Sequence, residues 1–262
     1  HKFLKTAYAV KIISPEVVRE DAGLLVRFRQ EAILAASIHH PNVVAVTDYG
    51  VENDTTPYLV MEYIEGISLD DYLRKEKQLS PLKAFEILAP IALGVAEAHS
   101  KGIIHRDLKP LNIMLRNGYP LSQAVKVLDF GLAKIKSSES FASLIQAKTN
   151  NLLGSPHYMP PEQWANEDID ARSDVYSLGV ILFQMLTGSV PFRGESIVNI
   201  MYQHLQVPTP ALASFGISVS PQIEAVVQKA LSKEQAGRFA SVEEFLSEYE
   251  KSLLLTSSRF SK

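Results

Sequence analysis

The middle of the sequence carries two polar clusters a short distance apart. The first is His-Arg-Asp-Leu-Lys-Pro-Leu-Asn over residues 105–112, and the second, Asp-Phe-Gly, begins at Asp129, 17 residues after Asn112. Phosphoryl transfer needs metal ligands, charge neutralisation and a group that orients the attacking hydroxyl, and these residues supply one candidate for each task. Asp107 and Asn112 lie five positions apart on an expected loop, so one can face the nucleophile and the other a metal. Asp129 adds a second hard oxygen ligand of the kind that suits Mg²⁺.

Taken together, the two clusters resemble the catalytic motifs of the protein kinase superfamily, of the serine/threonine type. The resemblance covers nearly the whole chain and implies that ATP is the phosphoryl donor and Mg²⁺ the metal. It implies that Asp107 accepts or orients the proton of the substrate hydroxyl and that Lys109 neutralises charge on the transferred group. It also implies that Asn112 and Asp129 hold the magnesium ions. Catalysis would then rest mainly on positioning and electrostatics.

A lysine and a glutamate near the N-terminal end match two further kinase motifs. Lys11 ends Ala-Val-Lys in a strand expected over residues 6–13, and Glu31 lies on a helix expected over residues 20–37. The resemblance implies that Lys11 holds the α- and β-phosphates and that Glu31 pairs with it. Glu31 is at the usual distance before the His-Pro-Asn of residues 40–42.

Residues 58–66, Tyr-Leu-Val-Met-Glu-Tyr-Ile-Glu-Gly, resemble the last strand of the small kinase lobe and the hinge that follows it. The resemblance makes Met61 the gatekeeper at the back of the adenine pocket, with backbone groups from Glu62 to Ile64 binding the adenine edge. Ala9 would lie above the base and Met114 below it. These apolar residues also fit an ordinary core, so both interpretations stay open.

Two further expected interactions are structural and not catalytic. Residues 154–162, Gly-Ser-Pro-His-Tyr-Met-Pro-Pro-Glu, resemble the end of a kinase activation segment, with proline in place of the usual alanine. Glu162 is expected to form a buried ion pair with Arg238. Asp174 is expected to anchor the backbone of the loop over residues 105–112 from a buried helix.

The choice of hydroxyl and the control of activity are predicted from residues near Asp107. Lys109, two positions after it, is typical of serine/threonine kinases, and Ser155 stands where these kinases usually have threonine. In kinases that carry an arginine directly before the aspartate, here Arg106, a phosphorylated residue of the activation loop pairs with that arginine. We predict autophosphorylation at Thr149, the alternative being a plain solvated hydroxyl. The next candidates along the loop are Ser143 and Ser140.

Length and composition fit this interpretation. With 262 residues, of which 46% are hydrophobic, the chain can form one large domain or two lobes around a sizeable core. The formal net charge of −3 argues against a dedicated nucleic-acid-binding protein. The absence of cysteine excludes disulfides and thiolate sites and fits a reducing compartment. The longest apolar region, Val175 to Leu186, is too short and too polar to span a membrane.

A β-rich first part followed by a helical part predicts an α+β, bilobal protein kinase fold. The small lobe is expected over residues 1–61, the hinge over 62–66, the large lobe over 67–254 and a polar tail over 255–262. No Gly-x-Gly-x-x-Gly precedes Ala9. We expect the first strands and the glycine-rich loop to be missing from the N-terminal end, through disorder, truncation or true absence.

The sequence therefore predicts a non-specific serine/threonine protein kinase that acts on proteins in the cytoplasm and self-associates for trans-autophosphorylation. The details resemble the bacterial serine/threonine kinases, which often continue into a linker and a membrane span. One alternative is a pseudokinase that acts as a nucleotide-binding or scaffolding module. It would usually have lost Lys11, Asp107 or Asp129, all of which are present. Another alternative is a small-molecule kinase of the aminoglycoside type, which typically has His-Gly-Asp and lacks Pro-Pro-Glu.

Overall fold

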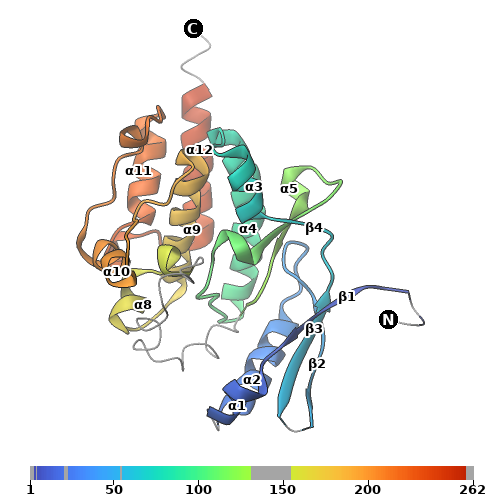
Figure 1. Ribbon diagram of the computed structural model, residues 1–262. Helices are drawn as coiled ribbons and strands as arrows, with labels where there is room; N and C mark the ends of the chain where they lie inside the picture. The colour runs from blue at the N-terminus through green and yellow to red at the C-terminus, as the bar shows by residue number, and fades with distance from the viewer. Residues whose placement is uncertain (1–2, 4, 21–22, 54, 131–154, 258–262) are drawn as a thin grey trace.

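The computed structural model describes residues 3, 5–20, 23–53, 55–130 and 155–257. Figure 1 shows a small lobe with strands β1, β2 and β3 at one end of the molecule and a larger helical lobe at the other. This is the α+β, bilobal arrangement that the sequence predicts. Within the described residues, no helix combines the length and the apolar character that crossing a membrane requires.

The small lobe is a three-stranded antiparallel sheet covered by helices. Its strands are β1 (Tyr8–Ile12), β2 (Val46–Glu52) and β3 (Thr56–Glu62), in the order β1-β3-β2. Helix α1 (Pro15–Glu20) leads into α2 (Leu24–Ser37). Because Leu24, Phe28 and Ala32 recur every four residues, they form one buried stripe along α2. This stripe packs in one core cluster with Leu59 and Met61 of β3 and with Val44, which precedes β2.

Two elements of the small lobe, a helix and a strand, begin at residues that differ from those expected from the sequence. The helix expected over residues 20–37 begins only at Leu24, after Gly23, a residue of low helix propensity, and Glu20 is instead the last residue of α1. The strand expected from Val43 to Tyr49 begins only at Val46. Val43 forms an isolated parallel bridge to Val127, and the Val44 N–H donates to the Val127 carbonyl at 2.9 Å. These two residues therefore pair with the large lobe.

The large lobe is built around two buried helices, α4 (Pro81–Ser100) and α9 (Ala171–Thr187). The Ser80 side chain caps α4 by accepting the N–H of Lys83, and Pro81 occupies the first turn, as the sequence predicts. In α9, 14 of the 17 residues are buried, which explains why it lacks a polar face.

The remaining elements complete this lobe. A second sheet has the order β4-β5-β6, with β4 (Gly66–Ser68), β5 (Ile113–Arg116) and β6 (Val125–Val127). Helix α12 (Val242–Ser257) extends three residues into the segment expected as a polar tail. The other α-helices are α3 (Leu69–Glu76), α5 (Leu121–Ala124), α8 (Pro161–Ala165), α10 (Ile197–Gln206), α11 (Pro221–Ala230) and α12 (Val242–Ser257). The 3₁₀ turns are η1 (Pro110–Asn112), η3 (Ser155–Tyr158), η4 (Leu212–Phe215) and η5 (Gln235–Gly237).

Candidate active site

Residues 105–112 form a segment between α4 and β5, and Asp174 of α9 anchors its backbone. This fully buried carboxylate on α9 accepts the N–H of His105 at 2.8 Å and the N–H of Arg106 at 3.0 Å. The His99 ring bonds the same carboxylate at 2.7 Å. Burial alone would raise the pKa of Asp174, but the bonds from His99 and from the His105 backbone keep its pKa below the ordinary value. The predicted anchoring role of Asp174 is confirmed.

The loop is also fastened to the chain around Asp129. The His105 Nε2–H donates to the Leu128 carbonyl at 2.8 Å, and the His105 ring meets the Phe130 ring edge-on at 4.6 Å between centroids. Arg106 and Asp129 both have positive φ, 67° and 61°. Non-glycine residues rarely adopt this conformation, and such strain clusters at functional sites. Residues 105–112 and the segment around Asp129, the two predicted polar clusters, are therefore in direct contact.

Asp107, Lys109 and Asn112 converge on one point of the loop. Lys109 Nζ lies 3.0 and 2.8 Å from the two carboxylate oxygens of Asp107. Asn112 Nδ2 donates to the Asp107 carbonyl at 2.8 Å and to its carboxylate at 3.2 Å. These bonds use the amide nitrogen, and the amide oxygen of Asn112 accepts no hydrogen bond from the described residues, so it can serve as a ligand.

The Lys11 ammonium lies 2.7 Å from a carboxylate oxygen of Asp129. In the part of the chain that the structure describes, this is the ion pair that Lys11 forms, and the predicted pairing with Glu31 is not formed in this conformation. Glu31 is buried on α2, whereas Asp129 is partly exposed and its turn faces β1. Lys11 and Asp129, 118 positions apart, therefore meet where the two lobes join.

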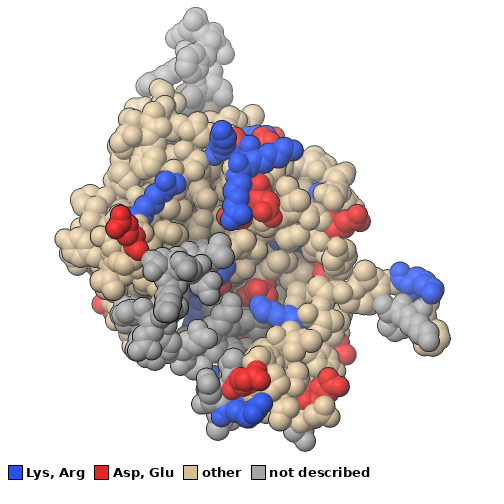
Figure 2. Space-filling view, viewed as in Figure 1, with Lys and Arg blue, Asp and Glu red and all other residues tan. Residues whose placement is uncertain are grey.

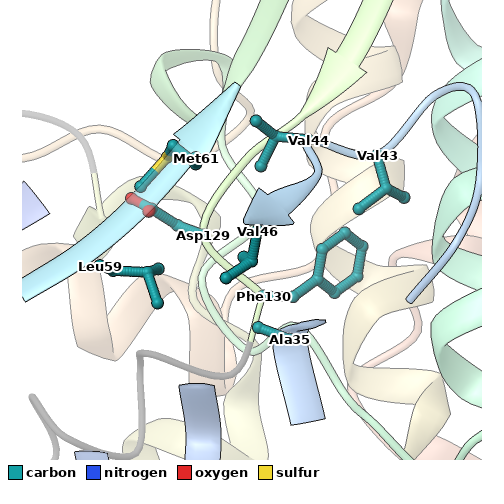
Figure 3. A pocket seen from close by; sticks show the side chains of 8 residues that line it. All are labelled: Ala35, Val43, Val44, Val46, Leu59, Met61, Asp129 and Phe130. Atoms are coloured by element: carbon teal, nitrogen blue, oxygen red, sulfur yellow. The ribbon is translucent and has the colours of Figure 1, made fainter. Parts of the chain in front are cut away.

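Met61 lies at the end of β3 against a cavity between the lobes. Leu59 and Met61 point toward this cavity, together with Val44, Val46 and Asp129, as Figure 3 shows. The side chains that line it are Ala35, Val43, Val44, Val46, Leu59, Met61, Asp129 and Phe130. This place, behind the strand end and next to Asp129, is compatible with the predicted gatekeeper position.

The backbone beyond Met61, where the hinge is expected, differs in its hydrogen bonding from residue to residue. The Glu62 N–H already donates to the Ala45 carbonyl at 2.9 Å, so this N–H is not available to a ligand. Tyr63 and Ile64 form no backbone–backbone hydrogen bond with the described residues. Their N–H and C=O groups therefore suit the recognition of a flat heterocycle edge.

The two residues expected to sandwich the base come from different lobes. Ala9 stands opposite Met61 in the β1–β3 register, and Met114 stands opposite Ser68 in the β4–β5 register. Both are half-buried. Along the chain, Ala9 precedes residues 62–66 and Met114 follows them. This order is compatible with the predicted arrangement.

The donor set at the junction suits magnesium. Among the described residues no three His, Cys, Asp or Glu side chains come together as a metal cluster. Mg²⁺ does not need such a cage, because it is usually held by one or two carboxylates together with substrate phosphates and water. Asp129 supplies a carboxylate and Asn112 an amide oxygen, both hard ligands. Thr149, Ser143 and Ser140 lie outside the described residues.

Sequence reasoning missed two residues that support the site. His99 was not singled out, although it bonds Asp174. Lys126 was also missed, although its Nζ donates to Glu62 Oε1 at 2.5 Å. The available signal was a lysine in the middle of the strand Val-Lys-Val, all three residues of which are buried. A charged residue is rarely buried unless it is paired.

On the face shown in Figure 2, acidic and basic side chains are interspersed around the described surface.

In the large lobe, the predicted buried pair of Glu162 and Arg238 is confirmed, with two contacts of 2.7 Å. Such a pair fixes structure and offers no group to a substrate.

Comparison with known proteins agrees with this geometry. The chain is 40% identical over 239 residues to the serine/threonine-protein kinase PknB of Mycolicibacterium smegmatis, and 39% identical over 236 residues to PrkC of Bacillus subtilis. Each match covers 90% of this chain but only 37% and 35% of the relative, so the chain spans just over a third of their length. The crystal structure of the PknI kinase domain of Mycobacterium tuberculosis superposes with a TM-score of 0.71 at 26% identity, covering 94% of this chain and 85% of that one. The profile of the protein kinase domain matches residues 1–249. The chain therefore belongs to the protein kinase domain family.

Proposed function

We propose that this chain is the catalytic domain of a serine/threonine protein kinase, which transfers the γ-phosphoryl group of ATP to Ser and Thr hydroxyls of proteins. The observation that carries the proposal is that Lys11 contacts Asp129 and that the Asp107 loop is bonded to the residue before Asp129, so that all three meet at the junction between the lobes. A cation, two metal ligands and a hydroxyl-orienting carboxylate are what phosphoryl transfer requires. The relatives named above support the serine/threonine assignment.

The residues of the chain divide the work. The Asp107 carboxylate orients the substrate hydroxyl and takes its proton, while Lys109, 2.8 Å away, places a positive charge beside the transferred group. Asn112 and Asp129 would hold Mg²⁺, which neutralises phosphate charge when it is bound. Lys11 would hold the α- and β-phosphates. Because the Lys11 ammonium now contacts Asp129, it must change partner before both groups can serve the nucleotide, and Glu31 is the proposed partner.

The first prediction tests the metal ligand. Asp129→Asn removes the charge that would bind Mg²⁺ and is expected to lower kcat/KM by about 10²-fold or more, the typical cost of losing a preorganised electrostatic contact. Radiolabelled ATP, a generic Ser/Thr protein substrate and a Mg²⁺ titration of the full-length protein measure this effect. Asp168→Asn, which changes an exposed carboxylate of the large lobe, is the matched control. Equal activity of both variants at every Mg²⁺ concentration would refute the assignment.

The second prediction concerns Thr149. We propose that a second copy of the chain phosphorylates this residue and that Arg106 then pairs with the phosphate. The Arg106 side chain lines a small pocket with Asp107, Tyr158 and Gln163, so a paired phosphate would order the substrate side of the site. Thr149→Ala is expected to lower activity about 10-fold or more.

The controls for Thr149→Ala are the alanine variants of Ser140 and Ser143, which should keep most of the activity. Phosphopeptide mapping of the active protein provides the decisive measurement. A fully active protein that carries no phosphate at Thr149 would rule out this control mechanism.

Because ATP is abundant in the cytoplasm and the chain contains no cysteine, we also propose that the domain acts in that compartment.

A further inference from the structure

Lys233, between α11 and η5, lines a polar cavity of about 590 Å³ in the large lobe. The residues that line this cavity belong to α8, α9, α10, η5 and the segments next to them, and none of them lines the cavities that contain Asp107 or Asp129. Lys233 is half-buried. Its ammonium group lies 4.0 Å from the centroid of the Phe192 ring and donates to the Gln203 carbonyl at 3.0 Å.

The Lys233 ammonium forms no ion pair with a carboxylate among the described residues. Its nearest charged neighbour is another cation, because the Arg238 guanidinium group donates to the Lys233 carbonyl at 2.8 Å. Burial, together with the charge of Arg238, lowers the pKa of Lys233 from its ordinary value of 10.5 to about 8. About half of this amine is therefore neutral at pH 8, and a neutral amine is a nucleophile.

The other charged and titratable groups around Lys233 decide which reagent can reach it. They are Glu162, Glu167, Asp168, Arg172, His204 and Glu234. Glu162 and Arg172 are already paired with other side chains, and burial lowers the pKa of His204 to about 3, so that its ring is neutral. The remaining three are exposed carboxylates at the cavity. They repel a reagent that is negatively charged next to its reactive carbon, and they favour an uncharged one.

We propose that Lys233 is a site of acylation by an uncharged acyl thioester, and that the acyl group loosens the C-terminal end of α10. The neutral Nζ attacks the carbonyl carbon of the thioester and forms an amide bond with it. The C–S bond breaks, and the sulfur leaves with the bonding electron pair and takes up the proton that Nζ loses. The products are an amide and a thiol, so nothing is oxidised or reduced. The cavity beside Nζ provides space for the acyl group.

The effect on α10 follows from the place of the Lys233 ammonium. The Gln203 carbonyl lies in the last turn of α10 and also accepts the N–H of Val207, the C-cap residue, at 3.1 Å. A cation at this end of a helix stabilises it through the helix dipole. The acylated side chain keeps one N–H but has no charge, so both this stabilisation and the cation–π contact with Phe192 are lost.

Helix α10 connects this cavity to the substrate side of the proposed active site. Ile197 and Ile200 of α10 form an apolar cluster with Trp164, against which Met159 packs. Met159 also lines the small pocket that contains Asp107. A loosened α10 would therefore disturb the protein-substrate side of the site and leave the nucleotide side unchanged.

The first test treats the full-length protein with the S-acetyl thioester of N-acetylcysteamine and follows each lysine by peptide mass spectrometry. Lys229 is the internal control, because its ammonium also lies over a ring, that of Phe239 at 4.2 Å, but is paired with Glu244 at 3.4 Å. At pH 8 we expect Lys233 to be acetylated about 10-fold faster than Lys229, because lysine reacts as the neutral amine. The rate at Lys233 should level off above about pH 9. Equal rates at the two lysines would overturn the site.

The class of donor is tested with acetyl phosphate, which is negatively charged beside its reactive carbon. The ratio of the rate at Lys233 to the rate at Lys229 should be lower with acetyl phosphate than with the thioester. A higher ratio with acetyl phosphate would overturn the assignment of an uncharged donor.

Hydrogen exchange measures the effect on α10. In the acetylated protein and in Lys233→Gln, the amides of residues 203–207 should exchange about 2- to 5-fold faster than in the untreated wild type, the ratio that corresponds to the usual effect of a cation at a helix C-terminus. Lys233→Arg keeps the charge and should exchange as the wild type does. Exchange that stays slow in both neutral forms would overturn the loosening of α10.

The last readout rests on the proposed kinase activity. Lys233→Gln should raise the KM for a protein substrate and leave the KM for ATP unchanged, whereas Lys233→Arg should change neither. Faster exchange in α10 with an unchanged KM for the protein substrate would overturn the connection to the substrate side. A wild type that transfers no phosphate would refute the kinase proposal, and the acetylation rates and the exchange of α10 would then decide the inference by themselves.

Discussion

Asp107→Asn is expected to lower kcat by about 10²- to 10⁴-fold, the usual contribution of a positioned general base. The substitution keeps the shape of the side chain and removes its charge. In the wild type, both carboxylate oxygens accept from Lys109 Nζ, at 3.0 and 2.8 Å. An amide keeps only one acceptor oxygen for the Lys109 ammonium, carries no negative charge and cannot take the substrate proton.

The measurement is phosphate incorporation from labelled ATP into a Ser/Thr protein substrate, with ATP affinity and thermal unfolding followed in parallel. Affinity and the unfolding midpoint should change little, because the loop backbone stays anchored on Asp174. The exposed substitution Asp168→Asn is again the matched control. If Asp107→Asn kept wild-type kcat with a normal fold, the hydroxyl-orienting role would belong to another residue.

The residues around Asp107 were predictable because their geometry is mostly local or buried. The residues from His105 to Asn112 follow one another closely along the chain, and Asp174 is a carboxylate in a buried helix that has to find donors. The pairing of Arg238 with Glu162 was predicted from the resemblance to the kinase family, and the structure shows the physical reason for it. Neither charge can be buried without the other, because an unpaired buried charge strongly destabilises the fold.

The partner of Lys11 could not be predicted in the same way. Glu31 and Asp129 are two carboxylates that compete for one ammonium, and the choice depends on how the lobes sit relative to each other. Spacing along the chain carries no information about that angle. Lys126 was missed because its partner Glu62 is 64 positions away and had been assigned only a backbone role. The pairing of Val43 and Val44 with β6 likewise looks like an ordinary strand in sequence.

The largest effect on stability is expected for Arg238→Met, which should lower the free energy of unfolding by about 3–5 kcal/mol, the range measured when one partner of a buried ion pair is removed. The guanidinium group is fully buried and bonds both oxygens of Glu162 at 2.7 Å. It also donates to the backbone carbonyls of Ser232, Lys233 and Arg172. Methionine would fill most of the volume but remove every one of these hydrogen bonds and leave the Glu162 charge without its cation.

Urea unfolding of wild type, Arg238→Met, Glu162→Gln and the double variant measures the effect and its coupling. The double variant should be less destabilised than the sum of the single variants, because the second change removes the charge that the first leaves buried. Lys251→Met at the exposed ion pair with Glu248 should change the free energy of unfolding very little. Additive single effects would show that the two side chains act independently, contrary to this prediction.

The effect of Arg238→Met should also depend on pH. Burial alone would raise the pKa of Glu162, but the bonds and charge of Arg238, with the Ser173 hydroxyl, hold it below its ordinary value of 4.5. In the wild type this contribution is therefore present above pH 4.5 and is lost as the pH falls through the lowered pKa. Without Arg238, burial is largely unopposed, the pKa of Glu162 rises, and the carboxyl group can become neutral on mild acidification. The stability gap between wild type and Arg238→Met should thus be widest near neutral pH and narrow toward acid pH, and a gap that stays constant from pH 8 to pH 4 would contradict the electrostatic account.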